Sequence, residues 1–383
     1  MTADLARILG ADRVDDEGGL PVVTPRDEAE VAELLRAATR DGLALAVRGG
    51  GTKAGWRPAP ARCDAVLSTA ALAGVVDRQP GDMTLVARAG TSLAAIQDEV
   101  AADAAHRQRL MLDAVGGPAA TLGGVLATAA AGPTRHRYGT PRDIVIGARY
   151  VTGDGLVAKT GGTVVKNVAG YDVAKLLIGA RGSLAVITEA AVRLHPVPEA
   201  ARTVVLRTRD ALEAAAFVER VQAAPLTPTA LEVRWPDGVV AVRIGSTEAG
   251  ADAQVALLHG LGDVEELDAA AGDALLEEQL ALPFAGGGAV LGVGVKPTDL
   301  AALLGAAADA GGAPGARAAL VAGDVALPDA DPARVARLAT AVRALGGSVQ
   351  PRGDAAVERE TAAGVARVEA AVKQALDPAG VLV

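Results

Sequence analysis

A chain of 383 residues with 50% hydrophobic residues is long enough for about two domains with large buried cores, which excludes a disordered protein. Aromatic residues make up only 2% of the chain, so the core must be built from Ala, Val and Leu. The net charge of −9 argues against a nucleic-acid partner, because nucleic-acid-binding proteins usually present a basic face.

The single cysteine, Cys63, can form neither an intrachain disulfide nor an iron–sulfur cluster. No two of the four histidines lie at metal-ligand spacing, so we expect no metal site. The N-terminus lacks the pattern of a secretory signal, and the weakly polar stretch 119–132 is too short for a membrane span. We therefore expect a cytoplasmic protein that reaches a membrane only through partners.

The first clear unit runs from Val22 to Gly51 and predicts a strand, a helix, a second strand and a loop, in that order. We expect Thr24 to cap this helix, with Pro25 as its first residue and Asp27 at the capping-box position. Its apolar face is expected from Val31, Leu34, Leu35 and Ala38, and its end at Asp41-Gly42. The strand Leu43–Val47 then leads into the loop RGGGTKAG, residues 48–55.

Apolar patterns predict further elements along the chain. In the first half we expect strands at 65–67, 84–88, 144–152, 156–160 and 183–188, and helices at 92–106 and 171–178. The sequence Gly153-Asp154-Gly155 predicts a hairpin turn. In the second half we expect strands at 203–207, 230–233, 239–244, 289–295 and 318–322, and helices at 211–223, 251–261, 298–310 and 332–344. A last helix should bury Val365, Val368, Val372 and Leu376 on one face and end at Asp377-Pro378.

The loop RGGGTKAG has two interpretations. Successive glycine N–H groups can form a nest for a pyrophosphate, or the segment can be a plain glycine-rich connection. Trp56, Pro58 and Pro60 follow the loop and prevent it from opening a helix, so a Rossmann fold is rejected. A P-loop is rejected as well, because no Gly-Lys-Ser/Thr follows at the right spacing.

A second glycine-rich segment, from Thr121 to Glu189, contains Gly123-Gly124 and Gly161-Gly162 among small residues. Main chain with so few side chains suits a long flat cofactor pressed against it. A local excess of cations lies in this segment, at Arg135, Arg137, Arg142 and Arg149. The cluster suits either an anionic ligand or an ordinary solvated surface.

Five motifs occur in the order RGGGTKAG, TLGGVLATAAAG, YGTPRDIV, KNVAGYDV and GSLAVITE. In this order they resemble the flavin domain of the vanillyl-alcohol oxidase and para-cresol methylhydroxylase (PCMH) superfamily, over about Val22 to Pro198. The resemblance implies an α+β protein with a two-subdomain PCMH-type FAD-binding domain at 1–198. An α+β cap domain at 199–355 and a C-terminal helix at 356–383 that returns to the FAD domain would follow. The prolines Pro196 and Pro198 support the first boundary.

The resemblance also implies roles for individual residues. The pyrophosphate of FAD would be held by Gly49, Gly50, Gly51, Thr52 and Gly55. The flavin and ribityl region would lie along Asp113, Thr121, Gly123, Gly124, Ala127 and Thr128. Backbone contacts would come from Gly182, Ser183 and Ile187. No histidine stands where relatives attach the flavin covalently, so we expect non-covalent FAD.

Within the superfamily, the motifs most closely resemble the FAD-binding subunits of bacterial glycolate oxidase. This implies oxidation of glycolate, or a similar 2-hydroxy acid, to the 2-oxo acid, with hydride passing to flavin N5. Electrons would leave through a larger FAD-linked subunit and an iron–sulfur subunit. Candidates for polar chemistry at the flavin are Tyr171, Lys166 and Arg135, each of which is equally compatible with an ordinary structural or surface role.

Two departures from the family keep alternatives open. The motif H-x-G-D-G-N-x-H, which in related dehydrogenases is implied to bind a metal and the hydroxy acid, is missing here. Ala185 stands where the family usually has glycine. The chain could therefore be a stand-alone FAD-linked oxidoreductase with another substrate, or a non-catalytic subunit that relays electrons.

Overall fold

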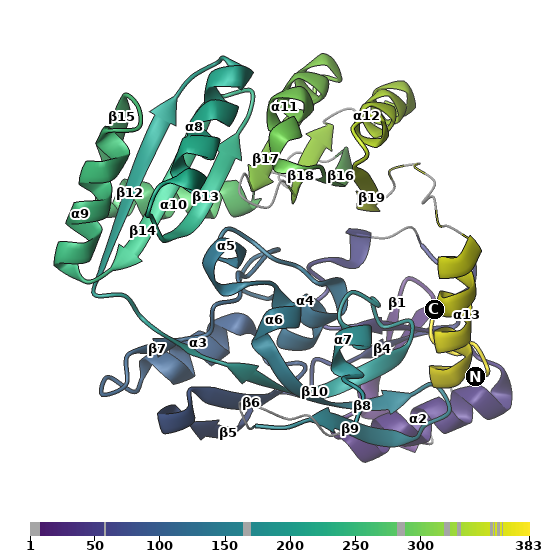
Figure 1. Ribbon diagram of the computed structural model, residues 1–383. Helices are drawn as coiled ribbons and strands as arrows, with labels where there is room; N and C mark the ends of the chain where they lie inside the picture. The colour runs from purple at the N-terminus through teal and green to yellow at the C-terminus, as the bar shows by residue number, and fades with distance from the viewer. Residues whose placement is uncertain are drawn as a thin grey trace.

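The computed structural model describes residues 8–56, 59–163, 170–281, 288–317, 322–327, 331–352, 355, 357, 361 and 363–383. The described residues form two layered units, one above the other in Figure 1, and helix α13 runs along their side. The chain passes from the lower to the upper unit between β11 (His195–Pro196) and β12 (Ala200–Arg207). A domain boundary at 198 is compatible with this course, and we retain the division at 198 and 355 as a proposal.

The first sheet of the lower unit has the strand order β1-β2-β4-β3. Strands β2 and β3 both run parallel to β4, while β1 is antiparallel to β2. Its elements are η1 (Ala11–Arg13), β1 (Val14–Glu17), β2 (Leu20–Val23), α2 (Glu28–Asp41), β3 (Leu45–Arg48), η2 (Ala54–Trp56) and β4 (Ala65–Ser68). Parallel pairing forces the chain to cross back between strands, and α2 makes the crossover from β2 to β3.

Helix α2 buries the four residues that its periodicity predicts, and Gly42 ends it with φ 65°. The predicted start was wrong. Asp27, not Thr24, is the N-cap, because its carboxylate accepts the N–H of Glu30 at 2.9 Å. At the other end of the helix, Arg36 and Thr39 donate to carbonyls of the predicted hairpin at 153–155, which attaches α2 to the second sheet.

The second sheet of the lower unit is antiparallel, in the order β5-β6-β10-β8-β9. Its strands are β5 (Val75–Gln79), β6 (Thr84–Arg88), β8 (Val145–Thr152), β9 (Val157–Gly161) and β10 (Ala185–Arg193), and η3 (Pro80–Asp82) lies between the first two. The helices of this part are α3 (Leu93–Ala101), α4 (Leu122–Thr128), α5 (Arg135–Tyr138), α6 (Pro141–Ile144) and α7 (Ala174–Leu177). The short strand β7 (Gln108–Arg109) pairs with β11 outside this sheet.

Two predicted helices are shorter than expected. The helix expected at 92–106 starts as predicted, with Ser92 as its cap, but ends at Ala101. Asp103 explains the early end, because its carboxylate accepts the N–H of Ala105 and bonds His106, an alternative to helical hydrogen bonding. The helix expected at 171–178 spans only residues 174–177.

The upper unit is built on one eight-stranded antiparallel sheet in the order β15-β12-β14-β13-β17-β18-β16-β19. Its further strands are β13 (Pro228–Arg234), β14 (Val239–Ser246), β15 (Val264–Leu267), β16 (Ala289–Gly294), β17 (Ala313–Arg317), β18 (Ala322–Leu327) and β19 (Ser348–Arg352). Of the strand expected at 318–322, residues 318–321 lie outside the described residues.

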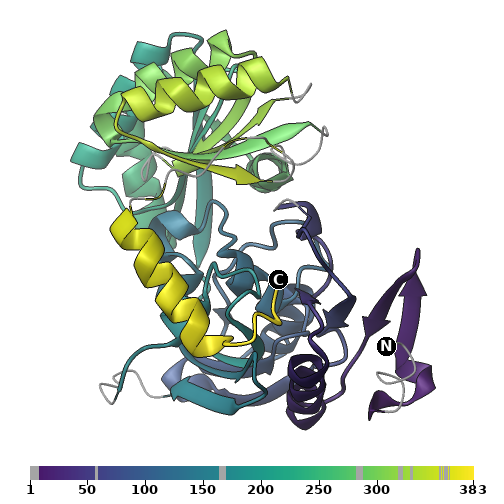
Figure 2. The same cartoon turned by 90° about the vertical axis from the view of Figure 1, so that its right-hand side faces the viewer.

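Four helices cover the face of this sheet that points away from the lower unit (Figures 1 and 2): α8 (Ala211–Ala223), α9 (Glu248–His259), α11 (Leu300–Asp309), which follows η5 (Pro297–Asp299), and α12 (Pro332–Ala344). They enclose the larger hydrophobic core with Phe217 fully buried in it. Helix α10 (Ala269–Ala281) lies on the other face, where its Leu275 packs against Val205, Val239 and Ala241. The rest of that face is turned toward the lower unit.

The C-terminal segment returns to the lower unit through the last turn of α13 (Ala363–Leu376) and the residues after it. Lys373 donates to the carbonyl of Ser183 at 2.6 Å, and the buried carboxylate of Asp377 accepts the N–H groups of Val381 and Leu382. The N–H of Leu45 donates to the Val381 carbonyl at 2.7 Å, which joins the chain end to β3.

The predicted apolar face of α13 was wrong for its first half. Val365 is 50% exposed and Val368 is 62% exposed. The helix is held at its C-terminal end by Lys373, Leu376 and the buried Asp377, so the earlier turns need no apolar contact with the lower unit.

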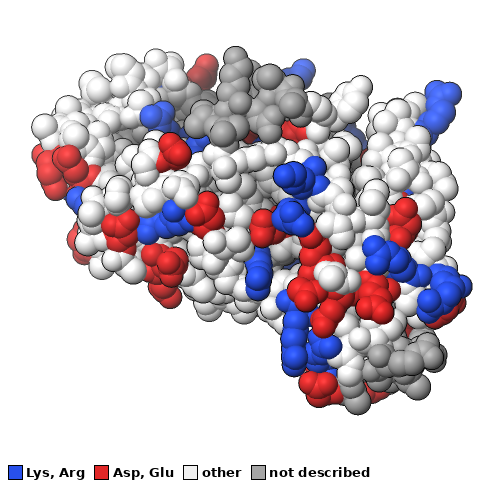
Figure 3. All heavy atoms as spheres, turned by 90° about the horizontal axis from the view of Figure 1, so that it is seen from below, with Lys and Arg blue, Asp and Glu red and all other residues white. Residues whose placement is uncertain are grey.

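The face seen in Figure 3 carries positive and negative side chains next to each other. Ion pairs of the lower unit include Arg13–Glu30, Arg40–Asp41 and Arg149–Glu28. Among the residues that the structure describes, no helix is long and apolar enough to cross a membrane.

Candidate cofactor-binding site

The glycine loop after β3 lies directly against the segment that leads into α4. A Cβ added to Gly50 would lie 2.0 Å from the carbonyl oxygen of Ala119, and one added to Gly49 would lie 2.3 Å from Oγ1 of Thr121. Real Cβ atoms do not approach other atoms this closely, so any side chain at these positions would push the two segments apart. Glycine is required here for close approach of two backbones.

Thr121 is the N-cap of helix α4, and its hydroxyl accepts the N–H of Gly124 at 3.2 Å. Its second residue, Gly123, donates to the carbonyl of Ala89 at 2.7 Å. A Cβ on Gly123 would lie 2.7 Å from the Cβ of Ala89, so the helix packs on the end of β6 through main chain.

A third segment, the turn before β10, packs against both the glycine loop's strand and α4. Arg181 has φ 54°, a left-handed conformation that is uncommon for a residue with a side chain. Its N–H donates to the carbonyl of Ala127 at 2.7 Å, which ties this turn to α4. Next to it, a Cβ on Gly182 would lie 2.9 Å from the Cβ of Val47, so the turn also packs on β3.

These three segments enclose a cavity of about 420 Å³. This volume is in the range of small-molecule and cofactor sites. Twelve of the residues predicted to contact FAD line it: Gly49, Gly50, Gly51, Thr52, Gly55, Thr121, Gly123, Gly124, Ala127, Thr128, Gly182 and Ile187. The structure thus brings together segments that lie up to about 140 residues apart, and the individual contacts to FAD stay predictions.

Asp113 and Ser183 were also predicted to contact FAD, but they are not among the residues described as lining the cavity. The carboxylate of Asp113 accepts the N–H and the hydroxyl of Thr134, at 3.1 and 2.8 Å. The hydroxyl of Ser183 donates to the carbonyl of Ala180. Both side chains hold loops next to the site.

Lys53 is a cavity residue that the sequence reasoning missed. Its side chain is buried, with Nζ 2.9 Å from the carbonyl oxygen of Val115 and 3.0 Å from Oγ1 of Thr52. Burial lowers the pKa of Lys53 to about 8. The signal was present in the sequence as a lysine inside a glycine loop, but that loop was interpreted only through its backbone.

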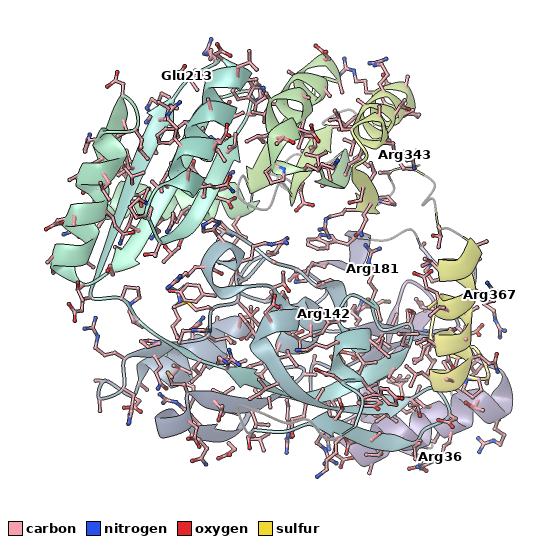
Figure 4. The ribbon with its side chains drawn as sticks, viewed as in Figure 1. Arg36, Arg142, Arg181, Glu213, Arg343 and Arg367 are labelled. Atoms are coloured by element: carbon pink, nitrogen blue, oxygen red, sulfur yellow. The ribbon has the colours of Figure 1, made fainter. Side chains whose placement is uncertain are left out.

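Further side chains missed by the sequence reasoning line the same cavity: Arg48, Trp56, Arg181 and Leu177. Arg48 pairs with Glu17 through two short hydrogen bonds, which raises the pKa of the guanidinium. Arg181 lies on the side of the lower unit that faces the upper unit (Figure 4). No aspartate, glutamate or histidine is found among the described residues that line the cavity.

The three residues proposed for polar chemistry have different positions. Tyr171 is 95% exposed and is not among the lining residues. Lys166 lies outside the described residues. Arg135 lies on the short helix α5, which packs against β13 of the upper unit, and next to it burial lowers the pKa of His136. A catalytic role for any of the three stays a prediction.

The residues present fit FAD. Glycines at the close approaches give the site walls of main chain, and a Cβ on Gly55 would meet no atom within 4 Å. Lys53 and Arg181 add positive charge, which suits an anionic dinucleotide. The lining is mostly apolar elsewhere, as expected for a site that holds a flat ring system.

Comparison with known proteins identifies the class of domain. Residues 20–161 match the family model of an FAD binding domain. Over the whole chain the fold is similar to that of p-cresol methylhydroxylase, with a TM-score of 0.75 at 13% identity, covering 99% of this chain and 94% of that structure. The lower unit therefore carries an FAD binding domain, and FAD is its cofactor.

Two relatives of known name are similar to this chain in sequence. The chain is 35% identical to the glycolate oxidase subunit GlcE of Escherichia coli over 212 residues, which is 55% of this chain and 57% of that protein. It is also 35% identical to the D-lactate dehydrogenase of Archaeoglobus fulgidus over 176 residues, 46% of this chain and 38% of that protein. The matches thus span about half or less of these relatives.

We expect Gly50→Ala to abolish tight FAD binding, because its Cβ would collide with the Ala119 carbonyl and separate two walls of the cavity. The measurement is fluorescence titration of the apoprotein with FAD. Gly81→Ala is the matched control, since a Cβ there meets no atom within 4 Å. Wild-type affinity in Gly50→Ala would show that the close approach is not needed.

Lys53 should make the stability of the apoprotein depend on pH. Because its folded pKa is about 8 and its unfolded pKa about 10.5, the folded state binds fewer protons in this window and is stabilised as pH rises through it. Lys53→Met removes this gain, so the free energy of unfolding of wild type relative to the variant should rise by about 3 kcal/mol from pH 7 to 10.5.

Urea unfolding at a series of pH values measures this difference. Lys159→Met, at an exposed position on β9, is the control and should follow the wild-type profile. A difference between wild type and Lys53→Met that stays constant over the whole range would contradict the assignment.

Proposed function

We propose that the chain is the FAD-binding subunit of an oxidoreductase that converts glycolate, or a similar 2-hydroxy acid, into the 2-oxo acid. The observation that carries the proposal is the main-chain-lined cavity with the cations Lys53 and Arg181 in its wall. The names of the two curated relatives, a glycolate oxidase subunit and a D-lactate dehydrogenase, support the same substrate class.

In this proposal the chain binds the substrate between the two units. Arg181 is half-buried and belongs to the cavity wall on the side facing the upper unit (Figure 4), so its guanidinium is suited to hold a carboxylate. The helix-free part of the upper sheet faces this side (Figure 1), and in this proposal it limits the access of water to the substrate. When bound, FAD would supply the acceptor for the hydride that leaves the substrate α-carbon, and the hydroxyl proton would pass to a base other than the described lining residues, which include no carboxylate or imidazole.

The FAD is held without a covalent bond in this proposal. Thr52 and Lys53 follow the glycines of the loop, and no cysteine or histidine is found among the described lining residues. The one cysteine of the chain, Cys63, has its sulfur 3.4 Å from the carbonyl oxygen of Ala65 and is not part of that lining.

Electrons leave through other subunits in this proposal. One cysteine cannot ligate an iron–sulfur cluster, which needs several thiolates, and we therefore place a one-electron carrier of that type on another chain. The relative's designation as a glycolate oxidase subunit supports an assembly, in which we place a larger FAD-linked subunit and an iron–sulfur subunit.

A second candidate function is an FAD-loaded subunit that relays electrons without oxidising a substrate itself. It is favoured by the described lining, which offers no carboxylate or imidazole to take the hydroxyl proton. The substrate would then be oxidised on the partner, and this chain would bind FAD with the same affinity.

An absorption spectrum of the FAD-loaded chain, before and after anaerobic glycolate, separates the two functions. A catalytic subunit should lose its flavin bands within the time of a few turnovers, because the hydride reduces the flavin. D-lactate should be run beside glycolate as a second 2-hydroxy acid, and acetate as a carboxylate with no hydroxyl to oxidise. Bands that persist with both hydroxy acids, but bleach once the partner subunits are added, would establish the relay instead.

If bleaching occurs, Arg181→Gln should lower the second-order rate constant of flavin reduction about tenfold to hundredfold, as expected for losing a hydrogen bond to a charged group. The loss should appear mainly as a higher substrate concentration for half-maximal reduction, with a smaller change in the maximal rate. Arg142→Gln, an exposed arginine of the same unit (Figure 4), is the control and should bleach like wild type. If Arg181→Gln needed the same substrate concentration as wild type for half-maximal reduction, Arg181 would not be part of the substrate site.

A further inference from the structure

A side chain of the upper unit contacts the wall of the FAD cavity. The guanidinium carbon of Arg352, on the last strand β19, lies 4.3 Å from the centroid of the Trp56 ring. Trp56 directly follows the glycine loop, in η2, and is one of the residues that line the cavity. The two residues are almost 300 positions apart, so this contact exists only in the folded chain.

The sheet of the upper unit fixes Arg352 in place. Its Nε donates to the carboxylate of Asp324 at 2.5 Å. Asp324 is on β18, and β16 lies between β18 and β19. The residue of β16 paired with Asp324 is Gly292, and a Cβ there would lie 3.3 Å from Nε of Arg352. The arginine therefore crosses over a glycine to reach its carboxylate.

Both partners of Arg352 are protected from water. Asp324 is 2% exposed and Trp56 is 7% exposed. An ion pair and a cation–π contact gain strength when water is excluded, because the local dielectric is low. A surface ion pair of the same sheet, Arg207–Glu265, has both side chains more than half exposed and lacks this protection.

We propose that Arg352, held by Asp324, is a positioning residue that fixes Trp56 in the cavity wall and thereby retains FAD. The upper unit then contributes to cofactor retention through one arginine. The proposal rests on the binding of FAD alone and is independent of which substrate is oxidised or whether the chain is catalytic.

The test is the rate at which the FAD-loaded protein releases FAD after dilution, followed by the rise in flavin fluorescence. Arg352→Ala should release FAD about threefold to thirtyfold faster than wild type, the range expected from losing one cation–π contact. Trp56→Leu should be faster by a similar factor. The double variant should be no faster than the faster single variant, because both substitutions remove the same contact.

Three further variants separate positioning from general folding. Arg352→Lys keeps the cation and should release FAD more slowly than Arg352→Gln, with both rates measured well below the temperature at which either variant unfolds. Asp324→Asn keeps the shape of the side chain but removes the charge that pairs with Arg352, so this variant should also release FAD faster than wild type. Arg207→Ala is the matched control, an ion-paired arginine of the same sheet, and should release FAD at the wild-type rate.

Wild-type release from Arg352→Ala, or single effects that multiply in the double variant, would overturn the proposal. Equal release from Arg352→Lys and Arg352→Gln would also overturn it, because the charge would then have no part in retention. If wild type itself failed to hold FAD, the cofactor assignment would fail, which is a different result from an unchanged release rate in the variants.

Discussion

The close approach of the glycine loop to the start of α4 is the constraint on which the site depends. A Cβ on Gly50 would lie only 2.0 Å from the Ala119 carbonyl oxygen, so these two backbones touch with nothing between them. Gly123 likewise leaves no room for a Cβ next to Ala89, and Gly182 leaves none next to the side chain of Val47. The three contacts together set the width of the cavity, and each is possible only because a side chain is missing.

A site built from main chain offers shape and N–H groups, but few side chains to hold or cover a ligand. The structure places those few at particular points. Lys53 and Arg181 bring charge, and Trp56 brings an aromatic wall. Lys53 is buried against two uncharged oxygens, so its charge is costly before a ligand arrives, and an anionic cofactor would offset that cost.

The upper unit lies over the lower unit and contacts it through the inner face of its sheet. Its helices α8, α9, α11 and α12 lie on the outer face of the sheet, so most of the inner face is directed at the cofactor domain (Figures 1 and 2). The contacts between the units include those of α5 with β13 and of Arg352 with Trp56. The return of the C-terminal residues to β3 closes the chain back on the lower unit, because Asp377 is buried there with its carboxylate satisfied.

The sequence by itself determined the FAD domain, since motifs such as RGGGTKAG and TLGGVLATAAAG need glycine at fixed points of one backbone. It also determined most helices and strands, because apolar periodicity is a local property of residues such as Val31, Leu34 and Ala38. Only the tertiary structure decided which side chains reach the cavity. Asp113 accepts a hydrogen bond from Thr134, Tyr171 is exposed, and Arg352 of the upper unit contacts Trp56 of the lower unit. Side-chain contacts of this kind depend on how distant elements pack, and no local pattern in a single sequence records that packing.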